Sequence, residues 1–265
     1  MIINKIYHLA DLHIRNLQRH KEYRQVFKKF LKQVKDDKFE DSVIYLAGDI
    51  AHAKTEMSPE LIQEISWFLT ECAKLKETIL ITGNHDCNLN NSHRLDVLTP
   101  IVDNLNNPRI HYLRDTGVYN IHNLTFVVYS ILDDKKNWPK GNAIEGENKI
   151  CLFHGPVNKA QTDIGYTVSS NSFQVDMFDG FDMALLGDIH KRQVISIPNK
   201  KKAYMVGSTI QQNFGESITK HGFGTYDLES DKYEFVDLVN PRPFLAFKIT
   251  DIEDLEHGKE ELTNY

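Results

Sequence analysis

The chain has 265 residues, 41% of them hydrophobic and 26% charged, which is enough for a buried core and ordinary for a folded protein. No apolar run approaches the roughly 20 residues that a bilayer span requires, so we expect no membrane partner. The formal net charge of −6 is unusual for a dedicated nucleic-acid-binding protein, although it is compatible with a local basic groove.

The first half of the chain alternates predicted strands and helices. Short apolar runs predict strands at residues 2–10, 43–47 and 78–82. Apolar residues at helical spacing predict helices at residues 21–34, 58–72 and 92–105. Ser58 is a good N-cap and Pro59 fits the first turn, whereas Pro100 should interrupt the last of these helices. We therefore expect an α/β fold.

The second half is rich in predicted strands. They fall at residues 118–121, 124–129, 149–153, 183–186, 194–197, 203–206, 224–228 and 233–238. His122-Asn123 between the first two predicts a tight hairpin turn, and Lys200–Lys202 after Pro198-Asn199 predicts another. Polar residues predict loops at 133–148 and 155–173, and the second loop should lie beside the functional site.

Five short polar motifs follow directly after predicted strands. They are Asp11-Leu-His13, Gly48-Asp49, Gly83-Asn84-His85-Asp86, His154-Gly155 and Gly187-Asp188-Ile189-His190. Residues just past the strand ends of an α/β sheet collect along one edge, where ligands bind. Carboxylate and amide oxygens together with imidazole nitrogens suit a pair of divalent metal ions.

In their order and strand context, these motifs resemble those of the calcineurin-like metallophosphoesterase superfamily. The resemblance implies an α/β fold, namely a four-layer α/β/β/α sandwich of two mixed sheets flanked by helices. His52, Gly207–Glu216 and Arg242-Pro243-Phe244 extend the resemblance to the SbcD-type DNA repair nucleases. On that basis residues 1–240 form a nuclease domain, and residues 241–265 begin an incomplete DNA-capping domain or form a C-terminal tail.

The metal site of that family maps onto seven residues of this chain. Asp11, His13 and His190 would hold the first metal, Asn84, His154 and Asp188 the second, and Asp49 would bridge both. The family usually uses manganese, so the resemblance implies two Mn²⁺ ions. Asp188 departs from the pattern, because the family typically has His there. A carboxylate is a harder ligand and should favour Mn²⁺ or Mg²⁺ over softer ions.

The same resemblance implies catalytic and substrate-binding residues. His85 would act as general acid or transition-state donor, and His52 would contact the phosphate or help to place DNA, although His52 could equally be a surface residue. Asp86 could orient His85 or only cap the turn. Basic residues that follow two of the metal motifs are candidates for phosphate contacts: Arg15, Arg19, Lys191 and Arg192.

The resemblance therefore implies a metal-dependent DNA exonuclease or endonuclease of repair or recombination, which works with an SbcC-like ABC-type ATPase. Members of the family also commonly form homodimers. A small-molecule phosphodiesterase or phosphoprotein phosphatase with the same centre remains an alternative, and so does a non-catalytic scaffold of the same fold. The three cysteines form no CxxC pair and no secretory signal pattern is evident. We expect an intracellular setting, which is the cytoplasm or nucleoid, or the host cell if the chain is viral.

Overall fold

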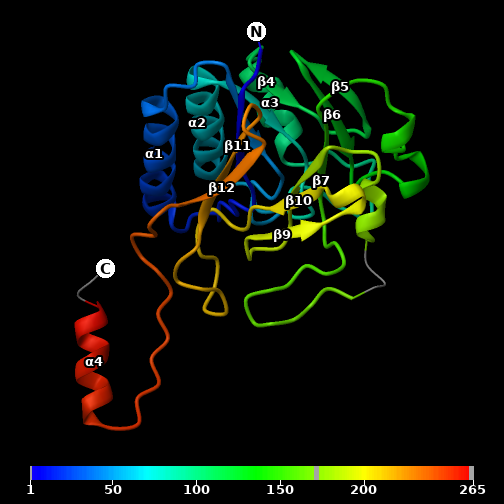
Figure 1. The fold of residues 1–265 in the computed structure, drawn as a ribbon. Helices are drawn as coiled ribbons and strands as arrows, with labels where there is room; N and C mark the ends of the chain where they lie inside the picture. Colours follow the sequence, from blue (N-terminus) through cyan, green and yellow to red (C-terminus); the bar gives the residue numbers. More distant parts are fainter. Residues whose placement is uncertain (1, 170–172, 263–265) are drawn as a thin grey trace.

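The computed structural model describes residues 2–169 and 173–262, and over these residues the chain forms a sandwich of two six-stranded sheets (Figure 1). The first sheet has the strand order β12-β11-β1-β2-β3-β4. Its strands are β1 (Lys5–Leu9), β2 (Ser42–Leu46), β3 (Glu77–Leu80), β4 (Ile110–Tyr112), β11 (Gly222–Asp227) and β12 (Lys232–Asp237). β1 to β4 run parallel, and β11 and β12 extend the sheet antiparallel to their neighbours.

The second sheet has the strand order β5-β6-β7-β8-β10-β9. Its strands are β5 (Gly117–Ile121), β6 (Leu124–Tyr129), β7 (Lys149–His154), β8 (Met183–Gly187), β9 (Gln193–Ser196) and β10 (Lys202–Met205). The four central strands are parallel, and β5 and β9 pair antiparallel at the two edges. Both sheets are therefore mixed, as predicted.

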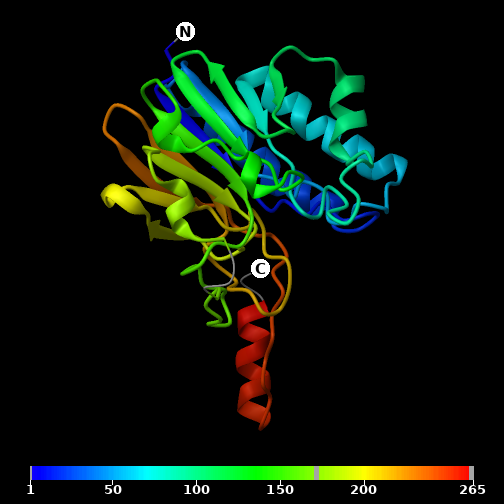
Figure 2. The ribbon, with the colours of Figure 1, turned by 90° about the vertical axis from the view of Figure 1, so that its right-hand side faces the viewer.

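Helices lie on the outer faces of the sandwich. α1 (His20–Asp36), α2 (Pro59–Leu75) and α3 (Leu98–Leu105) pack on the first sheet (Figures 1 and 2). The outer face of the second sheet is covered by loops and by short 3₁₀ turns at Lys135–Asn137, Gly141–Ala143, Val175–Phe178 and Pro198–Lys200. Figure 2 shows the last helix, α4 (Ile252–Leu262), projecting away from the sandwich at the end of an extended segment.

Both faces of β1 are buried, although the strand contains Lys5 and His8. Tyr7 and Leu9 face α1 and α2, where they pack with Phe30 and Phe68. Ile6 faces the second sheet and shares a core with strands β6 to β8. A strand that is buried on both faces has no side exposed to solvent, so β1 is rich in apolar residues and lacks a strict alternation with polar ones.

The predicted strands are all present within one to three residues of their expected bounds, and the Lys200–Lys202 turn joins β9 to β10. The short strand β4 was not predicted, because three residues carry too little pattern. Residues 252–262, expected to belong to an incomplete DNA-capping domain or to a C-terminal tail, form α4. None of the helices in the described part of the chain has the length and apolar content of a bilayer span.

The predicted helix over 92–105 is wrong at its start. α3 begins at Leu98, so Pro100 lies in the first turn, where its missing N–H does no harm. The carboxylate of Asp96 accepts hydrogen bonds from the backbone N–H groups of Leu98 (3.0 Å) and Thr99 (2.8 Å). These bonds satisfy donors that the helix itself leaves free, and they fix its beginning.

Candidate metal centre

The ends of β1, β2 and β3 in one sheet meet the ends of β7 and β8 in the other. His154, the last residue of β7, donates from Nδ1 to the carbonyl of Ala47 after β2, at 2.6 Å. The backbone N–H of Asp188, just past β8, donates to the carboxylate of Asp11 after β1, at 3.1 Å. The motifs that were expected at one edge of a sheet therefore come from both sheets and face one another.

Ligand atoms of Asp11, His13 and His190 form the first cluster and lie within 4.8 Å of one another. The Nε2 atoms of His13 and His190 are 3.0 Å apart. Because Nδ1 of His190 donates to Glu216 at 2.7 Å, its Nε2 is free to present a lone pair to the cluster. At most one proton can lie between the two Nε2 atoms, and a cation can take its place.

The second cluster is built on His154. Ligand atoms of Asp11, Asp49 and His154 lie within 4.8 Å of one another. Nε2 of His154 lies 2.9 Å from Oδ1 of Asn84, 3.4 Å from Oδ1 of Asp49 and 3.8 Å from Oδ1 of Asp188. The other carboxylate oxygen of Asp49 is 3.5 Å from Nε2 of His13, so Asp49 stands between the two clusters as a bridging ligand would.

The backbone at the centre is strained in a way that turns these side chains inward. Asp11, His13, Asp49 and Asp188 have positive φ angles of 52°, 46°, 52° and 98°. Such conformations are unfavourable for residues with a side chain, and they cluster at functional sites. Gly83 has a different reason: a Cβ there would lie 2.1 Å from Oδ1 of Asp49, so only glycine lets this carboxylate reach its position.

Burial and mutual charge shift the acid–base properties of the centre. Burial raises the pKa of the Asp11 carboxyl to about 7, although His190 and His154 oppose the shift. Burial keeps the pKa of His13 well below its usual range. Burial also opposes the charge on His190, but the hydrogen bond from its ring to Glu216 and the charge of Asp11 raise its pKa to about 9.

These residues fit a pair of divalent metal ions. Nδ1 of His154 donates its hydrogen to a carbonyl, so Nε2 carries no hydrogen when the ring is neutral. The lone pair of Nε2 then faces the side-chain oxygens of Asn84 and Asp49, which are acceptors as well. A bound cation resolves that conflict, as a second proton on the ring would. A mixture of carboxylate, amide and imidazole donors also suits divalent metal ions. All seven predicted ligands contribute a side chain to this centre: Asp11, His13, Asp49, Asn84, His154, Asp188 and His190.

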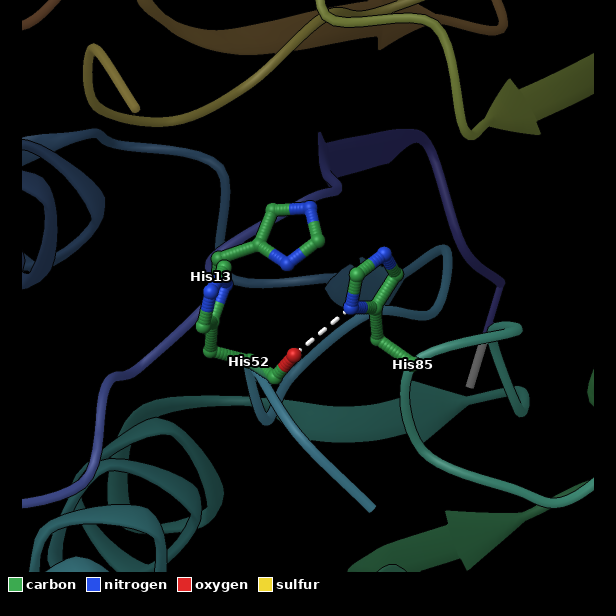
Figure 3. Close-up of side chains that lie close together, drawn as sticks. All are labelled: His13, His52 and His85. Atoms are coloured by element: carbon green, nitrogen blue, oxygen red, sulfur yellow. Dashed lines mark hydrogen bonds between the residues drawn. The ribbon is translucent and has the colours of Figure 1, made fainter. Parts of the chain in front are cut away.

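His52 and His85 form the rim of the centre with His13 (Figure 3). Nδ1 of His85 donates to the carbonyl of His52 at 2.6 Å, drawn as a dashed line in Figure 3. Nε2 of His52 accepts from Nη1 of Arg15 at 3.0 Å. Burial and the Arg15 charge lower the pKa of His52 to about 4, so this ring is neutral and carries its proton on Nδ1. That Nδ1 is buried and has no hydrogen-bond partner within the described residues.

The suggestion that Asp86 orients His85 is wrong, because the carbonyl of His52 does so. The carboxylate of Asp86 is buried and accepts from the backbone N–H groups of Gly83 (2.9 Å), Ala51 (2.9 Å) and Ile50 (3.3 Å). It therefore joins the Asp49 loop to the Asn84 loop. Asp86 therefore holds two ligand-bearing loops together. This is a structural role, as in the alternative prediction that Asp86 only caps the turn.

The four basic candidates for DNA contact differ in how they are held. Arg15 bonds to His52 and donates to the carbonyl of Gln212 at 3.2 Å. Arg19 is paired with Glu22 at 2.7 Å, and Arg192 is paired with Asp237. Lys191 forms no ion pair with any described residue and lines two hollows beside His190.

Sequence reasoning gave no role to Glu216, although it stands in the Gly207–Glu216 stretch. The structure places its carboxylate on His190. An isolated acidic residue in a predicted loop carries no signal of that contact, since the two residues are 26 positions apart. Only the folded chain brings them together.

Comparisons with known proteins agree with this arrangement. A protein of Acanthamoeba polyphaga mimivirus, described as uncharacterized protein R555, is 41% identical over 267 residues, which cover 96% of this chain and 19% of that protein. The chain thus spans about a fifth of the length of this relative. The crystal structure of TT1561 of Thermus thermophilus superimposes with a TM-score of 0.55 at 11% identity, over 89% of this chain and 99% of that one. At such low identity this likeness supports the fold alone.

The sequence profile described as calcineurin-like phosphoesterase matches residues 4–192, which contain every strand-end motif of the centre. Together with the mixed sandwich and the two ligand clusters, this match establishes the predicted superfamily. The chain belongs to the calcineurin-like phosphoesterase family.

Proposed function

We propose that this phosphoesterase is a two-metal, Mn²⁺-dependent nuclease that cleaves phosphodiester bonds in DNA. The observation that carries the proposal is a basic hollow that opens beside His190, together with a second hollow lined by basic residues near the start of α1. One phosphate ester needs a single phosphate site, whereas a nucleic-acid strand presents a series of phosphates. The proposal also rests on the resemblance to SbcD-type nucleases.

The first of these, which we term the lysine hollow, has a volume of about 510 Å³ and is lined by Lys191, Arg192 and Lys220, with Asp163 as its one acidic lining residue. His190 also lines it, so it opens directly from the metal centre. Hydroxyl groups of Ser217 and Thr219 add neutral donors. Lys191 and Lys220 form no ion pair with any described residue, so their charge is available to a phosphate.

The second, the arginine hollow, has a volume of about 540 Å³ and is lined by Arg19, His20, Lys21 and Arg242, with Glu22 and Glu60 at its side. It shares no lining residue with the lysine hollow. Arg15, four residues before Arg19, reaches the rim of the centre through His52. A strand crossing the centre would meet the charges of Lys191 and Lys220 in the lysine hollow. Lys21 and Arg242 would supply positive charge in the arginine hollow, since Arg19 is already paired with Glu22.

The chemistry follows from the placement of the side chains. Two bound dications, held by the residues of the two clusters, would supply charge stabilisation for the phosphodiester and a nucleophile at neutral pH. Nε2 of His52 accepts from Arg15 and its Nδ1 is buried, so His52 would help to place the phosphate through Arg15. His85 keeps Nδ1 on the carbonyl of His52, so its Nε2 is the atom that can deliver a proton to the departing oxygen.

A small-molecule phosphodiesterase or a phosphatase is the competing function. A hollow of about 270 Å³ beside Asp188 and His190, flanked by the exposed side chain of Ile164, would accept a compact ester. The test compares three substrates in Mn²⁺: linear DNA, bis(p-nitrophenyl) phosphate and a phosphopeptide. We expect DNA to be cleaved with the highest kcat/KM. Efficient hydrolysis of the phosphopeptide without release of nucleotides from DNA would overturn the proposal.

We further propose that the protein acts inside a cell, together with an ABC-type ATPase of the SbcC kind, and that it dimerises. The support is the resemblance to SbcD-type proteins, and a viral relative is compatible with action in a host cell. Co-purification of the protein with that ATPase tests the partnership. Sedimentation of the chain at micromolar concentration tests the dimer.

A further inference from the structure

The loop between β10 and β11 carries Glu216, which is almost fully buried at 6% side-chain exposure. Its Oε1 accepts from Nδ1 of His190 and from Nδ2 of Asn213, each at 2.7 Å. Its Oε2 accepts from the backbone N–H of Gln212, also at 2.7 Å. A carboxylate held by three donors has one orientation, and it imposes that orientation on the imidazole it contacts.

The same loop is fastened to a segment that lies 33 residues further along the chain. Gln211 is fully buried, and its side-chain amide pairs with the backbone of Phe244 in both directions: Nε2 donates to the carbonyl at 3.2 Å, and Oε1 accepts from the N–H at 2.8 Å. Nε2 also donates to the carbonyl of Glu216 at 3.2 Å. One side chain thus joins Phe244 to the residue that holds His190.

Ring contacts strengthen this attachment. The rings of Phe214 and Phe244 meet edge to face with centroids 5.0 Å apart. The guanidinium of Arg19 lies 4.8 Å from the centroid of the Phe244 ring, while its Nη1 donates to the carbonyl of Gln211 at 2.9 Å. Phe244 therefore sits between the loop and the start of α1.

Beyond Phe244 the chain leaves the sandwich and runs to α4 (Figures 1 and 2). Within the described residues, no hydrogen bond or ion pair links residues 245–262 to the sandwich. Phe247 faces α4 instead, since a Cβ at Gly258 would lie 3.6 Å from its ring. Phe244 is thus the last attachment point of a projecting arm.

We propose that Glu216 is a positioning residue for the metal ligand His190, and that the docking of Phe244 on Gln211 and Phe214 keeps Glu216 in place. The arm after Phe244 is then coupled to the affinity of the first metal site. The inference rests on the metal centre of the proposed function, but not on DNA as its substrate.

The experiment measures Mn²⁺ binding by titration calorimetry and the ligand-field spectrum of the Co²⁺-loaded protein, both without DNA. Glu216→Ala should weaken one of the two sites about 10- to 100-fold and change the spectrum. Glu216→Gln should recover part of the affinity, because its amide oxygen can still accept from His190. Wild-type affinity in the Glu216→Ala variant would overturn the positioning role.

The coupling is tested with two aromatic positions of the same arm. Phe244→Ala should weaken the same site about tenfold although it removes no atom near the metal. Phe247→Ala is the matched control, since that ring contacts α4, and it should bind Mn²⁺ like the wild type. Equal affinities in the two variants would overturn the coupling. Since neither measurement uses a nucleic acid, failure of DNA cleavage would not be mistaken for failure of this inference.

Discussion

The Nε2 atom of His13 lies 3.0 Å from the Nε2 atom of His190, so a proton or a cation must occupy the space between their lone pairs. A proton competes with the metal ion for these nitrogen atoms, because an imidazole nitrogen must lose its proton before it binds a metal. The same holds for the other cluster, where His154 faces Asn84 and Asp49. The pH dependence of metal binding is a consequence of this competition.

Mn²⁺ affinity should rise with pH between about 7 and 9. The pKa of His190 is raised to about 9, chiefly through Glu216 against the effect of burial, and burial raises that of Asp11 to about 7. Raising the pH through this range removes protons that the metal would otherwise displace. Calorimetry in buffers of different ionisation enthalpy should register proton release at pH 7 and less of it at pH 9. An affinity that is flat across this range contradicts the assignment.

Asp188→Asn should weaken the second site more than about tenfold, since even partners of metal ligands contribute 10–100-fold to affinity. The carboxylate oxygen lies 3.8 Å from Nε2 of His154, close enough to share an ion with it. Asp188→His, which introduces the residue typical of the family, should retain two ions per chain. Equilibrium dialysis with Mn²⁺ gives the stoichiometry. Two tightly bound ions in the Asn variant would remove Asp188 from the ligand set.

Asp86→Ala should destabilise the protein by about 3 kcal/mol. Three buried backbone N–H groups would lose their acceptor, and an unsatisfied buried donor costs about 1–3 kcal/mol. Urea unfolding of the metal-free protein measures the change. Asp237→Asn on the surface is a suitable control, with an expected effect below about 0.5 kcal/mol. Normal stability combined with lost activity would return Asp86 to a catalytic role.

Charge reversal in the lysine hollow should affect DNA and small esters differently. Lys191→Glu with Lys220→Glu should lower DNA affinity and reduce the slope of log K against log salt by about two. Hydrolysis of bis(p-nitrophenyl) phosphate should change little, because that ester has no further phosphates. Fluorescence anisotropy over a salt series measures the slope. Equal losses with both substrates would place the two lysines at the metal centre and not along a strand.

Much of the centre could be predicted because its ligands follow buried strands. Asp49 and Asp188 each follow a Leu-x-Gly sequence at the end of an apolar run, and the ends of parallel strands meet at one edge. The Asn84-His85 pair after β3 was found for the same reason. The sandwich of two mixed sheets could be predicted from the family resemblance, and the strand positions from hydrophobic pattern.

The partners of these residues could not be predicted. Arg19 was a candidate for DNA contact, but its guanidinium is engaged by Glu22, Gln211 and Phe244. Asp86 belongs to a ligand motif, yet it bonds only to backbone among the described residues. Contacts between residues tens of positions apart depend on the three-dimensional approach of loops, and loops have no periodic pattern from which that approach can be read.

The central claim is that this centre cleaves DNA with two metal ions. The measurement that tests it most directly is cleavage of end-labelled double- and single-stranded DNA in Mn²⁺, by the wild type and by His85→Ala, with Mn²⁺ binding measured on the same samples. We expect cleavage by the wild type that chelation abolishes. We expect a loss of about 10²–10⁴-fold in His85→Ala with two ions still bound, because a general acid contributes that much. Absence of cleavage by the wild type with both ions bound, or full activity of His85→Ala, would contradict the account.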